Sequence, residues 1–332
     1  MNKFSIILPV HNGGELLKLC VKSILDQTYS KFNLTVLDNC STDETVSWIE
    51  SINDNRIEII KSNEFLSIEN NWGRILDCKK NEFVTLIGHD DIMLPHYLSE
   101  MNDLIAKHPN ASLYQAHYNF INKDGNITGP CKPMDETQFG YEFLAAQMAN
   151  TIDSMGTGYM MRSIDYDSIG GIPINYPNLI FADYHLWICL SLLGYKATTL
   201  KTCFNYRLHN SVSRTTNGEA YQQAFEQYVY FISSLSETNI DAKIVVERYA
   251  YNMLMYYAEA LSHRILKTPT GKRKITVDQF LMKCVDYASI LIPGVPFNPM
   301  EKKKIWLAKY FDSNKFSRSS FNLIKRMSLA FS

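Results

Sequence analysis

The stretch FVTLIGHDDIMLPHYL, residues 83–98, holds the pattern that indicates the fold of this chain. Its first five residues form a mostly apolar run of strand length, and a helical pattern begins near Leu94, with Pro95 in its first turn. Two adjacent carboxylates, Asp90 and Asp91, stand between the two elements. One carboxylate can cap the helix while the other holds a divalent cation, so the sequence leaves both roles open.

Strands and helices alternate on both sides of this stretch. The periodicity predicts strands at 4–8, 34–37, 57–60 and 83–87, and helices at 15–27, 43–52, 68–79 and 95–107. This alternation is typical of an α/β fold with a parallel sheet, whose ligands bind beyond the carboxyl ends of the strands. Three strands end in polar clusters that would meet at that edge: Pro9-Val10-His11-Asn12, Asp38-Asn39 and His89-Asp90-Asp91.

The remainder of the chain is first irregular and then helical. Between Tyr114 and Tyr206 we predict short mixed elements and one clear helix, 182–193, which Asp183 begins. Helical patterns then follow at 219–236, 240–266, 276–291, 299–311 and 316–330. We therefore predict an α/β domain to residue 216 and an α-helical C-terminal region over 217–332.

Charge is unevenly distributed along the chain. The formal net charge of -1 excludes a strongly basic nucleic-acid binder, so no nucleic-acid partner is expected. Residues 301–332 nevertheless carry eight Lys and Arg against Glu301 and Asp312, a local +6 that leaves -7 for residues 1–300. Within residues 301–331 these charges alternate with aromatic residues. Such a segment suits a helix on an anionic membrane, and it equally suits a packed terminal helix with a solvated basic face.

The cysteines and the hydropathy indicate the compartment. Seven cysteines are scattered without a C-x-x-C pair, which is typical of buried thiols in a reducing environment. No apolar run approaches the roughly 18 residues of a membrane span. We therefore expect a cytoplasmic protein, held at the inner face of the plasma membrane if residues 301–331 bind lipid.

Several catalytic motifs are absent from the sequence. It has no G-x-x-x-x-G-K-[ST] loop, no G-x-G-x-x-G, no G-x-S-x-G and no H-E-x-x-H, which disfavours kinases, hydride transfer, serine hydrolases and zinc peptidases. Acidic residues remain as candidates. Asp183 and Asp38 can each be a helix cap or a functional carboxylate, and Arg207 and His209 can be structural or can serve a diphosphate or a metal.

Seven segments, taken in order, resemble the inverting glycosyltransferases of family 2, which have the GT-A fold. They are SIILPVHN (5–12), LTVLDNCSTDET (34–45), NNWGR (70–74), NEFVTLIGHDDIMLP (81–95), DSIGGIP (167–173), FADYHLWICLSLLGY (181–195) and YRLHNSVS (206–213). The resemblance covers about residues 4–213. It implies a Rossmann-like nucleotide-sugar-binding domain with a mostly parallel sheet, divided into a nucleotide-binding half (1–113) and an acceptor and catalytic half (114–216).

The resemblance also implies roles for individual residues. In the donor site it places Pro9, Val10, His11 and Asn12 against the base, Asp38 as the carboxylate that reads the base, and Asn71, Arg74, His89, Asp90 and Arg207 near the donor. Asp90 corresponds to the last Asp of the D-x-D motif, which binds Mn²⁺ or Mg²⁺, and His209 to a residue near the metal. Asp183 corresponds to the catalytic base.

Two departures from the family pattern leave alternatives open. Gly88 stands in place of the first Asp of D-x-D, and Ala182 replaces the Glu that usually precedes the base. The leading hypothesis is transfer from a UDP-sugar to a saccharide or lipid-linked acceptor in bacterial surface-polysaccharide assembly. A second is an inactive nucleotide-sugar-binding module, and a third is a nucleotidyltransferase. A homo-oligomer through helices 219–291 is left open.

Overall fold

The computed structural model describes residues 2–208, 216–269, 271, 273–314, 316–319 and 321. The chain forms two compact units. The first comprises Met1–Gln147, Thr151–Asn175 and Ala182–Ser211, and the second comprises Met148–Asn150, Tyr176–Phe181 and Val212–Ser332. The division therefore lies a few residues before the predicted boundary at 216, and two short earlier segments also belong to the second unit.

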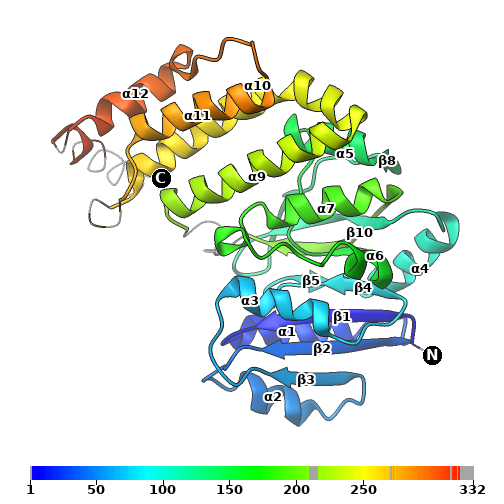
Figure 1. Cartoon of the computed structure of the whole chain (residues 1–332). Coiled ribbons are helices and arrows are strands. Elements are labelled where there is room, and N and C mark those ends of the chain that lie inside the picture. Colours follow the sequence, from blue (N-terminus) through cyan, green and yellow to red (C-terminus); the bar gives the residue numbers. More distant parts are fainter. Residues whose placement is uncertain are drawn as a thin grey trace. The chain divides into compact units, whose positions relative to one another are not determined.

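The first unit begins with the predicted parallel sheet. Strands β1 (Phe4–Val10), β2 (Phe32–Asp38), β3 (Ile57–Lys61) and β4 (Phe83–Leu86) lie in the order β3-β2-β1-β4 and are all parallel (Figure 1). Helices α1 (Gly14–Leu25) and α2 (Thr45–Ile52) connect the first three strands. Every residue of β1 is buried, as expected for a central strand covered on both faces. The α/β prediction is confirmed.

Several predicted helices differ from the structure in extent, and two of these differences lie next to the predicted site. The helix predicted at 68–79 is α3 (Ile68–Gly73) followed by a 3₁₀ turn (Arg74–Asp77), because Gly73 has low helix propensity and 3₁₀ turns commonly end short helices. The helix predicted from residue 95 is α4 (Tyr97–Lys107). Asp91 caps neither it nor another helix, because the chain first forms β5 (Ile92–Met93), which pairs with a distant strand.

The second half of the sheet is mixed rather than parallel. It contains β6 (Leu113–Ile121), β7 (Ile127–Pro130), β8 (Thr137–Phe139), β9 (Tyr159–Arg162) and β10 (Tyr195–Arg207). Helices α5 (Gly140–Met148), α6 (Ser163–Ser168) and α7 (Ala182–Leu192) lie between these strands along the chain. Strand β9 runs antiparallel between β4 and β6, and so it joins the two halves of the sheet.

Four helices make up most of the described part of the second unit. They are α9 (Gly218–Thr238), α10 (Ile240–Lys267), α11 (Val277–Leu291) and α12 (Lys303–Asp312). Helix α10 packs against the other three (Figure 1). Asn217, Asn239 and Thr276 cap the starts of α9, α10 and α11 through their side chains. The predicted helical C-terminal region is therefore confirmed, although most of the helix predicted at 316–330 lies outside the described residues.

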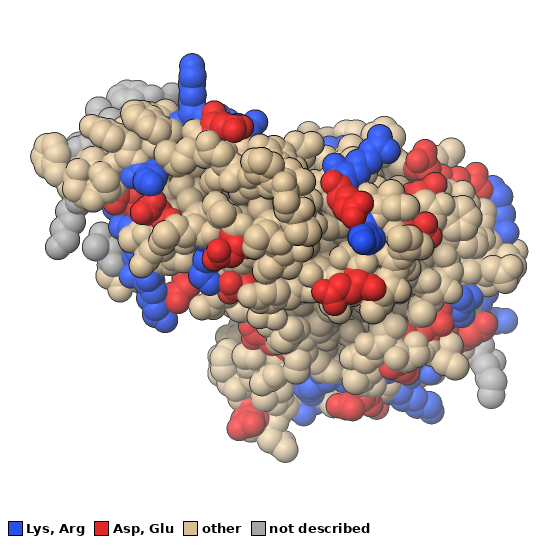
Figure 2. All heavy atoms as spheres, turned by 45° about the horizontal axis from the view of Figure 1, so that its top comes forward, with Lys and Arg blue, Asp and Glu red and all other residues tan. Residues whose placement is uncertain are grey.

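The surface charges and the character of the helices bear on which partners the protein could bind. In Figure 2, acidic and basic side chains are interspersed over the face that is drawn. Within the described part of the chain, no helix combines the length and the apolar character needed to span a bilayer.

Lys196 on β10 is a buried cation in the first unit. Its side chain is fully buried, and Nζ donates hydrogen bonds to Gln138 Oε1 at 3.1 Å and Thr198 Oγ1 at 2.9 Å. Burial lowers the pKa of this ammonium group to about 7. The charged form is therefore disfavoured in the folded protein, although the nearby Asp135 opposes the shift.

We expect Lys196→Met to raise the free energy of unfolding at pH 7, and the gain to shrink toward pH 10. The folded-state pKa lies below that of the unfolded chain, so the cost of burying the charge is absent above about pH 10.5 and grows as the pH falls toward 7. A gain of about 2 kcal/mol at pH 7 is expected in denaturant titrations, after the loss of the two hydrogen bonds. The exposed Lys201 on the same strand supplies the control, Lys201→Met. An equal change at both pH values would contradict the burial cost.

Candidate functional site

The carboxyl ends of β1 and β2 are joined by backbone and side-chain hydrogen bonds. Val10 is paired with Asp38 in the parallel register, and Asn39 N–H donates to Val10 O at 2.9 Å. His11 Nδ1 lies 2.7 Å from Asn39 O. The first two predicted polar clusters are therefore in direct contact, as their positions at neighbouring strand ends predicted. Pro9 and Val10 are buried within β1.

Asn12 connects the loop after β1 to the loop after β2. Its backbone has a φ of 50°, in the left-handed region that Asn tolerates better than most residues. Its Oδ1 accepts hydrogen bonds from the backbone N–H groups of Thr42 at 2.7 Å and Asp43 at 3.3 Å. Asn12 N–H donates to Ser41 Oγ at 2.9 Å. Asn12 therefore fixes the shape of this edge of the sheet.

Asp38 ends β2 with a buried carboxylate. Its two oxygens accept the Ser41 N–H at 3.3 and 3.4 Å. The Arg74 guanidinium binds the backbone next to this carboxylate. Its Nη1 donates to Asp38 O at 3.0 Å and to Asn71 Oδ1 at 2.9 Å, and its Nη2 donates to Ile60 O at 2.7 Å. Arg74 and Asn71 thus support Asp38 and the ends of two strands. Their predicted contact with the donor stays a prediction.

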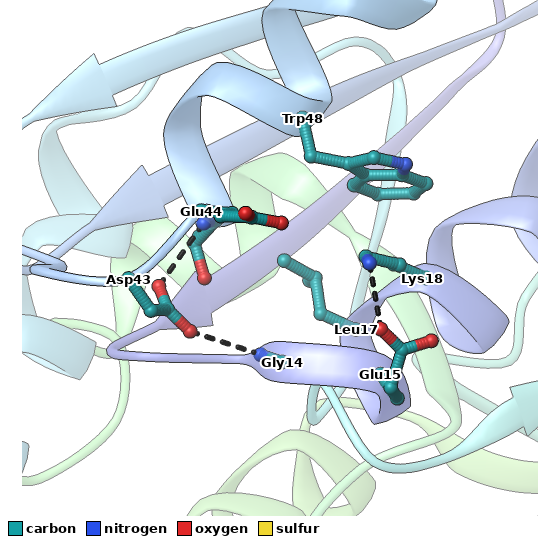
Figure 3. Close-up of a pocket in the computed structure, with 8 residues that line it drawn as sticks. Gly14, Glu15, Leu17, Lys18, Asp43, Glu44 and Trp48 are labelled. Carbon is teal, nitrogen blue, oxygen red and sulfur yellow. Dashed lines mark hydrogen bonds and ion pairs between the residues drawn. The ribbon is translucent and has the colours of Figure 1, made fainter.

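A pocket of about 250 Å³ adjoins this loop, between the N-terminal parts of α1 and α2 (Figure 3). Gly14, Glu15, Leu17, Lys18, Asp43, Glu44, Thr45 and Trp48 line it. Lys18 lies 2.6 Å from Glu15, and Gly14 N–H donates to Asp43 Oδ2 at 3.2 Å. None of the residues predicted for the donor site lines this pocket.

The third cluster follows β4, which is hydrogen-bonded to β1. Asp91 is buried; its Oδ1 accepts the Arg207 N–H at 2.9 Å and its Oδ2 accepts the Thr157 hydroxyl at 2.7 Å. Burial, together with the neighbouring charge of Asp90, raises the pKa of Asp91 well above its usual range. Asp90 and His89 are only partly buried. Of the two adjacent carboxylates, Asp91 therefore supports the loop and Asp90 is the one that retains solvent access.

The structure explains what Gly88 does in this loop. A Cβ atom added to Gly88 would lie 2.7 Å from Asp90 Oδ1, which is closer than real Cβ contacts. The Cys20 thiol also donates to Gly88 O, at 3.5 Å. An Asp at position 88 would therefore force the Asp90 carboxylate to move, whereas glycine lets it lie against the backbone.

Arg207, at the end of β10, ties several loops together. Its Nε donates to Asp90 O at 2.7 Å, and its Nη1 donates to Asn122 O and Lys123 O, both at 3.0 Å. The Arg207 backbone N–H also donates to Asp91 Oδ1, so Arg207 holds the Asp90-Asp91 loop through both its backbone and its side chain. The side chain is buried, and its predicted contact with a diphosphate stays a prediction. His209 lies outside the described residues.

Asp183 lies in the first turn of α7 and is a half-buried residue. The chain reaches α7 through residues of positive φ at Asn178, Leu179 and Phe181. Burial of the carboxyl group raises the pKa of Asp183 to about 6, although backbone N–H groups of the helix start oppose the shift. Asp183 is therefore a carboxylate at neutral pH with a basicity well above that of an ordinary Asp.

Two consecutive residues connect Asp183 to the Asp90-Asp91 loop. A Cβ atom on Gly156 would lie 3.8 Å from Asp183 Oδ2, and the next residue, Thr157, donates its hydroxyl to Asp91. Trp187, one turn along α7, donates its indole N–H to Met155 O at 2.8 Å and so anchors the same segment. Residues 155–157 therefore bring Asp183 to the loop that carries Asp90.

The sequence alone did not identify Gly156 and Thr157 as site residues. Thr157 is 66 positions from Asp91 along the chain, and a single buried threonine carries no periodic or motif signal. Only the antiparallel pairing of β9 with β4 brings the two together.

The carboxylate of Asp90 suits a divalent cation that is also bound by a phosphate group. Within the described residues, no group of three or more His, Cys, Asp or Glu side chains could hold a metal alone. Mg²⁺ commonly keeps several waters and binds through one or two carboxylates and substrate phosphates. Of the adjacent Asp90 and Asp91, Asp90 is the one that could supply such a carboxylate, because Asp91 is buried and faces inward.

Comparisons with known proteins bear on the family and on the fold. Residues 5–166 match the family described as glycosyl transferase family 2. An Escherichia coli protein named UDP-Glc:alpha-D-GlcNAc-diphosphoundecaprenol beta-1,3-glucosyltransferase WfaP is 27% identical over 227 residues, which are 68% of this chain and 85% of the relative. Residues 5–166 of this chain belong to glycosyl transferase family 2.

Further relatives support the same family and fold. The putative teichuronic acid biosynthesis glycosyltransferase TuaG of Bacillus subtilis is 26% identical to this glycosyltransferase, covering 63% of this chain and 81% of TuaG. The crystal structure of S. aureus TarS 1-349 in complex with UDP-GlcNAc superposes with a TM-score of 0.66 at 13% identity, covering 98% of this chain and 92% of that one. The GT-A fold prediction is confirmed.

We expect Thr157→Val to reduce turnover by about tenfold, because the lost hydroxyl leaves Asp91 Oδ2 without its donor and loosens the loop that holds Asp90. The free energy of unfolding should fall by about 1–2 kcal/mol, and Thr157→Ser should restore both quantities. Thr128→Val, which removes an exposed threonine hydroxyl on β7, is the control. A stability loss with unchanged turnover and unchanged UDP affinity would contradict a positioning role.

Proposed function

We propose that this glycosyltransferase moves a sugar from a UDP-sugar to a saccharide carried on a lipid diphosphate, with inversion at the anomeric carbon, during assembly of a bacterial surface polysaccharide. The name of WfaP specifies a UDP-glucose donor and a diphosphoundecaprenol-linked acceptor, and the TarS structure contains UDP-GlcNAc. The observation that carries the proposal is the basic carboxylate of Asp183, which residues 155–157 bring to the Asp90 loop.

The proposed reaction is a single displacement. An acceptor hydroxyl oxygen attacks the anomeric carbon while the bond from that carbon to the diphosphate oxygen breaks, and UDP leaves with the bonding electron pair. Asp183 takes the proton of the attacking hydroxyl, as its raised pKa favours. Asp90 and the donor phosphates would together hold a Mn²⁺ or Mg²⁺ ion, which when bound supplies positive charge next to the leaving diphosphate.

Asp38 supplies a basis for choosing among nucleotides. A carboxylate accepts hydrogen bonds but donates none when it is ionised, and uracil presents an N3–H donor where cytosine presents an acceptor. Asp38 would therefore bind UDP in preference to CDP. Asn12, His11 and Asn39 keep the loop around this carboxylate in place through the contacts described above.

The inactive-module hypothesis is not favoured. Its motivation was the loss of two family acids, but the packing accounts for both replacements. Ala182 is fully buried, so a Glu there would bury a charge, and Gly88 leaves space for the Asp90 carboxylate. Asp90 and Asp183 themselves are present. The nucleotidyltransferase hypothesis is replaced by the family assignment.

A donor screen tests the proposed function. UDP-, CDP- and GDP-sugars are supplied with Mn²⁺ or Mg²⁺ and a panel of lipid-diphosphate saccharides, and nucleotide release and glycosylated product are measured. We expect product with at least one UDP-sugar and none with its CDP analogue. Binding of UDP without transfer or hydrolysis for any pair would support an inactive module instead.

A further inference from the structure

Helix α12 in the second unit has two faces of different character. Its inner side buries Ile305, Ala308 and Asp312. At 3.6 residues per turn, Lys303, Trp306, Leu307 and Tyr310 project from the opposite side, and all four are exposed. We call these four residues the outer face of α12.

The outer face presents an aromatic surface to solvent. Trp306 is 51% exposed and Tyr310 is 56% exposed, and their rings stack with centroids 5.7 Å apart at an interplanar angle of 8°. Leu307 is 43% exposed beside them, and Phe316, six residues beyond Tyr310, is 84% exposed. Exposing large apolar side chains to water is unfavourable, so the stacked Trp306 and Tyr310, with Leu307 on the same side of the helix, indicate a binding surface.

Four lysines lie in α12 or immediately before it: Lys302, Lys303, Lys304 and Lys309. Lys304 pairs with Glu259 at 2.8 Å, and Lys309 pairs with Asp278 at 2.5 Å. Among the described residues, no carboxylate lies within ion-pair distance of Lys302 or of Lys303, and both are exposed. The segment 301–332 as a whole carries a charge of +6.

We propose that the outer face of α12 docks the protein on an anionic lipid bilayer. Trp and Tyr rings favour the interface between headgroups and acyl chains, where an apolar ring and a polar group are both accommodated. Lys302 and Lys303 contribute attraction to acidic headgroups. Docking would bring the enzyme to its acceptor, because a lipid-diphosphate saccharide is held in the bilayer; this connection rests on the proposed function.

The lysines favour a bilayer over a protein partner as the occupant. Lysine is depleted in the cores of protein interfaces, whereas amphipathic helices on membranes carry Lys beside Trp, Leu and Phe. Lys303 itself belongs to the outer face of α12 and lies three residues before Trp306. Its flexible stem can extend past the rings toward headgroup phosphates.

Vesicle flotation with the full chain tests the proposal. The probes are phosphatidylcholine vesicles with and without phosphatidylglycerol. We expect binding to the anionic vesicles, reduced at least about tenfold by the double variant Trp306→Ala/Tyr310→Ala. Replacing Lys302 and Lys303 with Gln should reduce binding about fivefold per lysine at low salt and less at high salt. Tyr230→Ala/Tyr256→Ala removes two exposed tyrosines elsewhere on the second unit and should change nothing.

The outcomes separate this proposal from the catalytic one. Asp183→Asn should bind vesicles like the wild type, and the Trp306/Tyr310 variant should keep its turnover with a water-soluble acceptor. Anionic-vesicle binding that is absent in the wild type, or that persists in a folded Trp306/Tyr310 variant, would overturn the docking surface. A dimer in light scattering that this variant dissociates would also overturn it, by assigning the outer face to a second copy of the chain.

Discussion

Asp183→Asn should abolish sugar transfer and leave the affinity for UDP-sugar unchanged. The amide has nearly the same size as the carboxyl group but cannot take the proton of the acceptor hydroxyl, so turnover should fall by about 10³-fold or more. Isothermal titration with the donor measures the affinity, and UDP release with an acceptor measures turnover. Asp241→Asn replaces an exposed Asp in the first turn of α10 and is the control.

The raised pKa of Asp183 leads to two further expectations, one for the wild type and one for the variant. Because the ionised form is the base, kcat/KM of the wild type should rise with pH and level off above about pH 6. The folded pKa lies above the unfolded value, so the charged carboxylate destabilises the fold at pH 8, and this cost vanishes as the pH falls below 3.8. Asp183→Asn should therefore be more stable than the wild type at pH 8, by up to about 3 kcal/mol. Full turnover in this variant would exclude Asp183 as the base.

Asp90→Asn should weaken the binding of UDP about 10- to 100-fold in the presence of Mn²⁺ and leave it unchanged in EDTA. The neutral amide is a poor ligand for a hard cation, so the variant loses only the metal-linked part of the affinity. Calorimetry with UDP in Mn²⁺ and in EDTA measures this difference directly for both proteins.

Asp91→Asn is the matched comparison, because the two residues are adjacent but face different surroundings. Asp91 accepts two hydrogen bonds in the interior, and the single oxygen of an Asn side chain could keep only one of them, so at a pH low enough to protonate Asp91 its replacement should lower the free energy of unfolding by about 1 kcal/mol. At higher pH the cost of the buried charge offsets this loss, because burial raises the pKa of Asp91. Its effect on UDP binding should be the same in Mn²⁺ and in EDTA. If Asp91→Asn, rather than Asp90→Asn, removed the metal-dependent affinity, the division of roles between the two carboxylates would be reversed.

The local sequence pattern predicted those parts of the site that follow single strands. The polar residues after β1, β2 and β4 could be placed at one edge because parallel neighbouring strands end together. Asn12 and Asp38 are in the loop positions that this argument gives, although their contacts with a donor stay predictions. Asp90 likewise follows a buried strand as expected.

Contacts between distant segments could not be predicted in this way. The pairing of β5 with β10 displaced the predicted start of α4, and the buried guanidinium of Arg207 binds carbonyls of two loops that lie far from it in sequence. Thr157 became part of the site only through β9. These features depend on tertiary packing, which overrides local periodicity and leaves no motif in the sequence.

The anomeric configuration of the product tests the central claim most directly. The sugar is transferred from the α-linked UDP-sugar that is active in the screen, and the new linkage is examined by proton NMR. A single displacement with Asp183 as base predicts a β-linked product, formed by the wild type and not by Asp183→Asn. An α-linked product, or transfer that is undiminished in Asp183→Asn, would contradict the account.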